Sequence, residues 1–199
     1  SYLAAAWYWW DKAIFGYWDT GSYVSMTNLV SNTWVVATDT TGVGTARSYL
    51  AAAWYWWDKA IFGYWYTGSN VSITNLVSNT WVVASDTTWV GTARRNLAAA
   101  WYWWDKAIFG YWLTSSNVSI TNLVSNTWVV ATDTTGVGTA RCRLAAAWYW
   151  WDKAIFGYWY TSSYVSITNL VSNTWVVATD TTGVGTDRYA LAAAWYSTT

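Results

Sequence analysis

Residues 3–18 read LAAAWYWWDKAIFGYW, and the same letters begin again at Leu50, Leu97 and Leu144. The period is therefore 47 residues, and a shorter copy, LAAAWY, begins at Leu191. Self-similarity at a fixed period indicates a repeat architecture and outweighs local propensity as a guide to the fold.

The repeats predict a single domain over residues 1–199. A unit of this length cannot bury its own apolar face, so each unit must pack against its neighbours. We place the repeats at residues 3–49, 50–96, 97–143 and 144–190, with a partial fifth copy at 191–199.

The composition is poor in charge and rich in aromatic residues. Charged residues make up 10% of the chain, against about 25% in ordinary soluble domains, and the net charge is zero. This balance argues against a nucleic-acid partner, and no apolar run reaches the ~18 residues of a membrane-spanning helix. The 22 tryptophans require a very dense core, a stacking surface for a ligand or a membrane interface.

Four residue types are absent: Pro, His, Glu and Gln. Their joint absence fits amplification of one unusual unit, a designed sequence, or residues assigned from an electron-density map. Cys142 is the single cysteine, so the chain has no internal disulfide.

Each repeat divides into short apolar segments separated by turn residues. In repeat 1 we expect strands at 3–10, 13–18, 24–30 and 33–38, although alanine also favours helix in the first of them. Four strands in a unit of this length is typical of a propeller blade. We therefore predict an all-β, four-bladed β-propeller with about four strands per 47-residue blade.

The copies differ mainly in the expected turns. The position after each GYW is Asp19, Tyr66, Leu113 or Tyr160, and further differences follow at 21, 23 and 48–49 and at the matching positions of the other repeats. Variation in turns is expected when strands form the core and loops face water.

The repeat resembles the blades of the hemopexin family. Those blades open with an Ile-Asp-Ala-Ala-Phe-like strand and continue with a Lys, an aromatic strand, a Gly and a Tyr-Trp pair. The matching words here are LAAAW at 3–7 and KAIFGYW at 12–18. The family's Asp is replaced by Ala4, and its Cys pair and its Pro are absent. The resemblance implies a four-bladed binding protein, of which hemopexin-like seed albumins are one group.

The resemblance also implies a cation site. In this family the opening strand lines a central tunnel, where backbone carbonyls can hold calcium or sodium, both of which prefer oxygen ligands. The alternative is that alanine is present only for close packing. Carried over, the carbonyl ligands would come from Ala4, Ala51, Ala98 and Ala145.

No catalytic constellation is visible, so we predict that the protein is not an enzyme. There is no His and no Glu to act as a base, and Cys142 has no evident activating partner. The Asp-Lys pairs that begin at 11, 58, 105 and 152 are expected to be solvated turn pairs. A second series, Asp39, Asp86, Asp133 and Asp180, lies between threonines and suits local capping of the backbone.

Repeated tryptophans could provide stacking platforms for sugars, with avidity from the repeats. The alternative is that most of them pack between blades, because large aromatic residues dominate core burial. The candidate ligand residues are Trp18, Trp65, Trp112 and Trp159.

These observations predict a non-enzymatic binding protein for a small molecule or a carbohydrate, with self-association as a further option. The alternative is a structural or designed repeat protein with no specific ligand. Two N-glycosylation acceptor patterns, at 70–72 and 117–119, favour secretion. The resemblance to seed albumins implies a seed storage compartment as the other option, and the sequence leaves the compartment open.

Overall fold

The computed structural model describes residues 4–8, 12–42, 44–55, 59–88, 91–102, 106–127, 129–136, 138–149, 152–183, 185–188, 191 and 193. Within these residues the protein is all-β, with no helix long and apolar enough to span a membrane. The strands are β1 (Ala4–Tyr8), β2 (Lys12–Asp19), β3 (Tyr23–Val30), β4 (Ala51–Tyr55), β5 (Lys59–Tyr66), β6 (Asn70–Val77), β7 (Ala98–Tyr102), β8 (Lys106–Leu113), β9 (Asn117–Val124), β10 (Ala145–Tyr149), β11 (Lys153–Tyr160) and β12 (Tyr164–Val171).

Each repeat forms one three-stranded antiparallel sheet, in the order β1-β2-β3, β4-β5-β6, β7-β8-β9 and β10-β11-β12. The second strand of each repeat is central. In β5 and β8 the six residues between the first and the last are all buried. Because both faces of this strand are buried, its sequence KAIFGYW does not alternate between polar and apolar residues.

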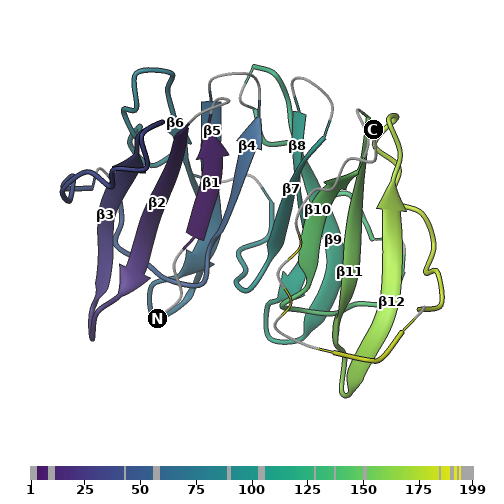
Figure 1. Ribbon diagram of the computed structural model, residues 1–199. Helices are drawn as coiled ribbons and strands as arrows, with labels where there is room; N and C mark the ends of the chain where they lie inside the picture. The colour runs from purple at the N-terminus through teal and green to yellow at the C-terminus, as the bar shows by residue number, and fades with distance from the viewer. Residues whose placement is uncertain are drawn as a thin grey trace.

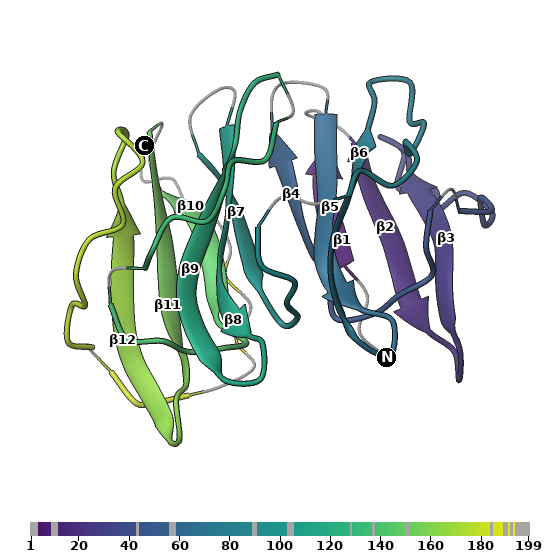
Figure 2. The ribbon, with the colours of Figure 1, turned by 180° about the vertical axis from the view of Figure 1, so that it is seen from behind.

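The four sheets fan out around their first strands (Figure 1). The contacts run from β1 to β4, from β4 to β7 and from β7 to β10. β1–β3 and β10–β12 form the two ends of the fan, and β5, β6, β8 and β9 lie toward the viewer in the opposite view (Figure 2). This arrangement confirms the predicted class, an all-β fold with four propeller-like blades.

In repeats 2 to 4, a phenylalanine packs on a glycine of the repeat before it. A Cβ atom added at Gly63 would lie 2.5 Å from Cζ of Phe109, so no other residue fits there without movement. The same Phe109 ring meets Tyr64 edge to face, with centroids 5.4 Å apart. Along the first strands, Trp54, Trp101 and Trp148 follow one another with ring centroids 4.4 and 4.6 Å apart.

The expected fourth strand is reduced to isolated bridges. In repeat 2, Val83 pairs with Val77 and Thr87 pairs with Thr74. Between these bridges the side chain of Asn75 donates to the carbonyl of Ala84 at 2.9 Å and takes a position that a ladder hydrogen bond would use. The sheet therefore ends in an irregular edge, and each blade has three regular strands.

A bulge interrupts the second strand in every repeat. In β5 the register shifts between Gly63 and Trp65, and the intervening Tyr64 has φ 57°. An extra residue in the left-handed region bends the strand and changes where its side chains point. The opening segment of each repeat, for which helix was the alternative, is a strand where it is described, as expected. All but Leu191 and Ala193 of the fifth copy lie outside the described residues.

Candidate functional site

A buried arginine lies in each contact between successive repeats, which we call a seam. Arg94 ends repeat 2 and is fully buried. Its guanidinium carbon lies 4.5 Å from the ring centroid of Tyr64 in the same repeat and 3.8 Å from that of Trp112 in the next. The arginine thus joins two repeats through cation–π contacts that gain strength from desolvation.

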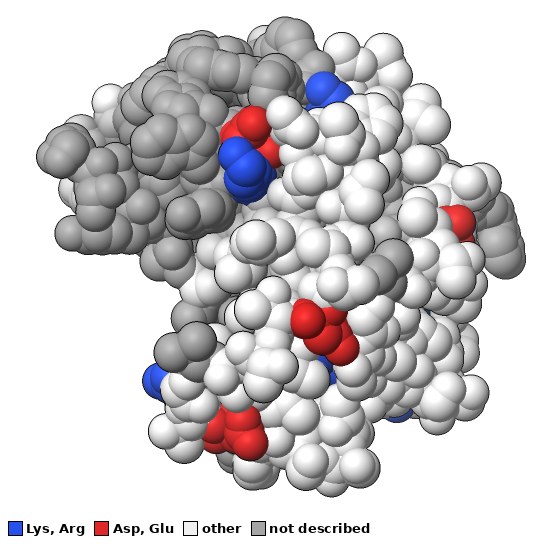
Figure 3. Space-filling view, turned by 90° about the vertical axis from the view of Figure 1, so that its right-hand side faces the viewer, with Lys and Arg blue, Asp and Glu red and all other residues white. Residues whose placement is uncertain are grey.

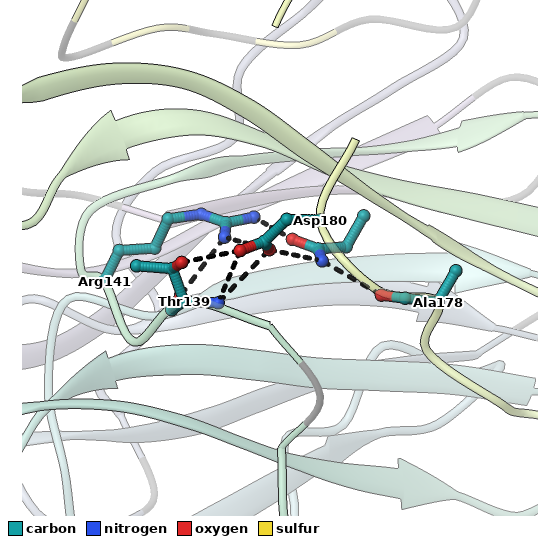
Figure 4. Close-up of polar contacts among 5 residues, drawn as sticks. Thr139, Arg141, Ala178 and Asp180 are labelled. Atoms are coloured by element: carbon teal, nitrogen blue, oxygen red, sulfur yellow. Dashed lines mark hydrogen bonds and ion pairs between the residues drawn. The ribbon is translucent and has the colours of Figure 1, made fainter. Parts of the chain in front are cut away.

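An aspartate of the following repeat completes this seam. Asp133 accepts hydrogen bonds from the backbone amide of Thr92 at 3.0 Å and from its hydroxyl at 2.6 Å. It also accepts from Arg94 Nη1 at 3.2 Å and from Asn122 Nδ2 at 2.9 Å. Figure 4 shows the same arrangement around Asp180, with Thr139 and Arg141. The first seam uses Thr45, Arg47, Asn75 and Asp86.

This pattern corrects the expectation of local capping. The Thr92 and Asp133 that bond are 41 residues apart in the sequence, so the aspartate links repeats and does not cap its own turn. The invariant Thr and Arg of the repeat tails were not singled out from the sequence. Their presence in all four repeats is a usable signal, but it does not say which repeat supplies the partner.

The seam shifts the pKa values of its members. Burial lowers the pKa of Arg94 to about 10, against the stabilising charges of Tyr64 and Asp133. In the next seam, burial raises the pKa of Tyr111, which lies beside Arg141, to about 12. For Asp133, burial acts to raise the pKa, but hydrogen bonds from Thr92 and Asn122 and the charge of Arg94 outweigh it, so the pKa is lowered. These carboxylates are charged at neutral pH, and the seams are structural.

A groove of about 560 Å³ opens where the turns of repeats 3 and 4 meet. Two tyrosines of repeat 4 supply its aromatic wall: Tyr160 is 40% exposed and Tyr164 is 47% exposed. Their ring centroids are 5.9 Å apart with planes inclined by 58°. The remaining lining residues are Leu113, Ser116, Asn117, Cys142, Arg143 and Thr161.

The polar groups of the groove are held in place by the backbone. Asn117 Nδ2 donates to the carbonyls of Thr161 at 3.0 Å and of Tyr160 at 3.4 Å, across the seam. The amide of Cys142 donates to the Tyr160 carbonyl at 3.3 Å. Arg143 is exposed at the groove and is the one charged residue among the described residues that line it. The groove thus combines two aromatic rings with a small set of hydrogen-bonding groups.

The groove is lined largely by positions that differ among the repeats. At the position of Cys142, repeat 2 has Arg95. The Arg95 guanidinium lies 4.7 Å from the ring centroid of Tyr66 and donates to Asn70 Oδ1 at 3.3 Å, so it covers this region of its own seam. The short, buried Cys142 has no comparable reach. Variation in the turns therefore gives the seams different surfaces.

The tryptophans predicted to bind ligand contribute to the interior where they are described. Trp65 and Trp112 are fully buried, and their rings face Arg47 and Arg94. The side chains of Trp18 and Trp159 lie outside the described part of the structure. The exposed aromatic surface in the groove comes from Tyr160 at the end of β11 and Tyr164 at the start of β12, which the sequence showed only as variable positions.

The alanines predicted to bind a cation begin the first strands. Ala4, Ala51 and Ala98 are buried, Ala145 is partly buried, and each pairs with the glycine of its second strand, as Ala51 does with Gly63. Neutral carbonyl oxygens fit a hard cation in kind. Among the described residues no group of three or more His, Cys, Asp or Glu could hold a metal ion. Calcium or sodium at the alanine carbonyls stays a prediction.

The other candidate reactive groups have structural surroundings. Asp152 pairs with Lys153 at 2.9 Å, while the equivalent aspartates at 11, 58 and 105 lie outside the described residues. Burial raises the pKa of the Cys142 thiol. A thiol that stays protonated at neutral pH is a poor nucleophile.

No protein-family model matches this sequence, and no curated protein matches it at a significant level. The resemblance to hemopexin blades therefore stays a prediction, and the function must be argued from the groove itself.

Proposed function

We propose that this protein is a non-enzymatic carbohydrate-binding repeat protein whose ligand occupies the groove between repeats 3 and 4. The observation that carries the proposal is the exposed pair Tyr160 and Tyr164, which converge on a groove that also presents Arg143 and Asn117.

The shape and the lining suit a sugar. A volume of about 560 Å³ is within the range of about 300–1,000 Å³ that is usual for small-molecule sites. Tyrosine offers an apolar ring face to the C–H surface of a sugar and a hydroxyl to its polar edge. Asn117, Ser116 and Thr161 add hydrogen-bonding groups around the rings.

The lining also supports binding without catalysis. None of the residues assigned to the groove is a carboxylate, whereas glycoside hydrolysis ordinarily uses a pair of them. The buried Cys142 thiol has a raised pKa and is unsuited to nucleophilic attack. The charge of Arg143 favours sugars that carry a carboxylate or sulfate group over neutral ones.

A glycan array followed by calorimetry with the selected sugar tests the proposal. We expect a hit whose affinity falls at least about tenfold in Tyr160→Ala and in Tyr164→Ala, because aromatic anchors carry most of the binding energy in such sites. Tyr66→Ala is the matched control, since Tyr66 occupies the position of Tyr160 in repeat 2 and lies under Arg95. It should leave the affinity unchanged.

The alternative is a structural or designed repeat protein without a specific ligand. Absence of any hit on the array, or an affinity that is the same in all three variants, would overturn carbohydrate binding at this groove and favour that alternative.

A further inference from the structure

The two ends of the fan carry the separate halves of one interaction that the interior repeats three times. In each seam one repeat supplies a threonine and a buried arginine, on what we call its outgoing face. The next repeat supplies the aspartate that they bind, on what we call its incoming face. Repeat 4 presents an outgoing face and repeat 1 presents an incoming face, and no described residue covers either of them in the way that the interior equivalents are covered. Four features of these faces can be compared position by position.

The first feature is the arginine–aspartate pair. Arg47, Arg94 and Arg141 are fully buried, but the equivalent Arg188 is exposed and its Nε donates to the Thr186 carbonyl at 3.2 Å. At the other end, Asp39 is exposed and accepts from Asn28 Nδ2 at 2.7 Å, in the same way that Asp86 accepts from Asn75. Within the described residues no ion pair joins Arg188 or Asp39 to a residue of opposite charge.

The second feature is a glycine that leaves room for the aspartate. At Gly44, Gly91 and Gly138 an added Cβ would lie within 2.5 Å of the Oδ1 atom of the next repeat's aspartate. Gly185 keeps the same left-handed backbone, with φ 115°, but its nearest atoms are 3.6 Å away. Among the described residues no aspartate approaches Gly185 as one approaches each interior glycine.

The third feature is a lysine–tryptophan contact. Lys12 lies 4.7 Å from the ring centroid of Trp81, and Lys106 lies 5.4 Å from that of Trp175, in each case one repeat further on. The equivalent outgoing lysine, Lys153, pairs with its neighbour Asp152. The equivalent incoming tryptophan, Trp34, is 84% exposed, against 38% for Trp81.

The fourth feature is apolar. The phenylalanines that pack on a preceding glycine are fully buried at 62, 109 and 156, but Phe15 is only partly buried. The last glycine of this series, Gly157, meets only a Thr168 methyl group at 3.4 Å, where the interior glycines meet a phenylalanine ring. In Figure 3, which views the repeat 4 end, the surface that is not grey is mostly uncharged, with small red and blue patches, two of which touch.

We propose that a second copy of this chain docks head to tail on the first, with repeat 1 of one copy placed on repeat 4 of the other. The contact repeats the interior seam: Thr186 and Arg188 bind Asp39, Lys153 covers Trp34, and Phe15 packs on Gly157. A heterologous contact of this kind closes into a ring when its rotation allows and otherwise extends into a filament.

The pairing of individual residues selects a second copy over other occupants. Arg188 and Lys153 of the outgoing face match Asp39 and Trp34 of the incoming face, while Asp187 and Asp152 leave the outgoing face without a net positive charge. The three interior seams show that these residue types fit one another in this backbone. A partner of different sequence would have to reproduce all four features.

Light scattering coupled to size-exclusion chromatography, extended by sedimentation equilibrium, tests the proposal on the full 199-residue chain. Wild-type protein should associate with increasing concentration. Asp39→Arg and Arg188→Asp should each weaken association at least about 100-fold, because each leaves two like charges facing one another. The double variant, which exchanges the two charges, should recover most of the loss. Arg143→Asp is the control for the change of charge alone and should associate like wild type.

Trp34→Ser provides a second test that does not depend on charge. Trp34 is so exposed that its loss should leave the melting temperature of the isolated chain unchanged while weakening association. The proposal is overturned if wild-type protein stays monomeric at every concentration. If the protein is monomeric and the charge variants destabilise the monomer, then repeats 1 and 4 of one chain bind each other, and the proposal is overturned as well. It is also overturned if the variants and wild type associate equally.

Discussion

Arg94 Nη1 lies 3.2 Å from Asp133 Oδ1, across the seam between repeats 2 and 3. The guanidinium is fully buried, and the carboxylate keeps about a quarter of its surface, with a side-chain exposure of 27%. Asp133 is therefore only partly desolvated. Burial lowers the pKa of Arg94, so the arginine depends on the charge of Asp133 to offset the cost of burial. Removing either partner is more damaging than replacing both with apolar groups.

The first prediction is that Asp133→Asn destabilises the protein. Arg94 would remain buried without a counter-charge, and we expect a loss of about 2–3 kcal/mol in the free energy of unfolding. Urea denaturation followed by tryptophan fluorescence measures it. Asp39→Asn, the same change at an exposed equivalent, should cost well under half as much in the monomer. Equal losses in the two variants would show that the seam does not depend on the ion pair.

A second prediction concerns the glycine that precedes the seam threonine. Gly91 has φ 82°, and an added Cβ would lie 2.4 Å from Asp133 Oδ1. Gly91→Ala should therefore cost about 2–4 kcal/mol, from backbone strain together with overpacking.

Gly185→Ala is the matched control for this prediction. Its φ is also positive, but its added Cβ would meet its nearest neighbours, Arg188 and Tyr158, at an ordinary contact distance of 3.6 Å, so only the strain remains, about 1 kcal/mol. Thermal unfolding of both variants separates the two contributions. If both substitutions cost the same, then close approach of the aspartate is not what requires glycine at this position.

The repeat length and the position of the strands could be predicted from the sequence, because hydrophobic words and turn residues are local signals. The loss of the fourth strand could not be predicted, because the side chains of Asn75 and its equivalents form hydrogen bonds in place of a backbone ladder. A β-branched segment such as TWVVA gives no indication of this. Propensity marks an extended segment and does not specify what its carbonyls bond to.

The seam and the groove needed the structure for a different reason. Asp133 and Thr92 are adjacent only after two repeats have packed, and a sequence in which every repeat is alike does not show which copy supplies each half. Trp65 and Tyr160 show the same difficulty. Trp65, which was predicted to stack on a sugar, is buried, whereas Tyr160, at a variable position at the end of a strand, is exposed.

The third prediction is a loss of stability in acid. For Asp86, Asp133 and Asp180, burial acts to raise the pKa, but hydrogen bonds and the charge of a buried arginine lower it further than burial raises it. A carboxylate with a folded-state pKa below its unfolded value of about 3.9 stabilises the fold above that pH. The stabilisation is lost as the pH falls through the folded-state pKa.

Urea denaturation at a series of pH values from neutral to strongly acid checks this expectation. The free energy of unfolding should be flat above the unfolded pKa and should decline below it. Asp133→Asn, which removes one of the three carboxylates, should make the decline shallower. A decline of the same steepness in this variant would assign acid sensitivity to other groups.

The fourth prediction tests why the groove is open between repeats 3 and 4. Arg95 reaches Asn70 in its own seam, and Cys142 occupies the same position beside Asn117. Cys142→Arg should therefore place a guanidinium over the groove and reduce sugar affinity at least about tenfold. The thermal stability should stay close to that of wild type, because the same residue is accommodated in repeat 2.

The reciprocal variant, Arg95→Cys, tests whether an open groove is enough to bind a sugar or whether the two tyrosines are also needed. It uncovers the equivalent region of the preceding seam, but there Leu113 and Asn117 stand at the positions of Tyr160 and Tyr164. Calorimetry should detect no second sugar site in this variant, since an open groove without its two tyrosines lacks the stacking surface. A second site of similar affinity would show that the shape of the turns, and not the tyrosine pair, selects the ligand.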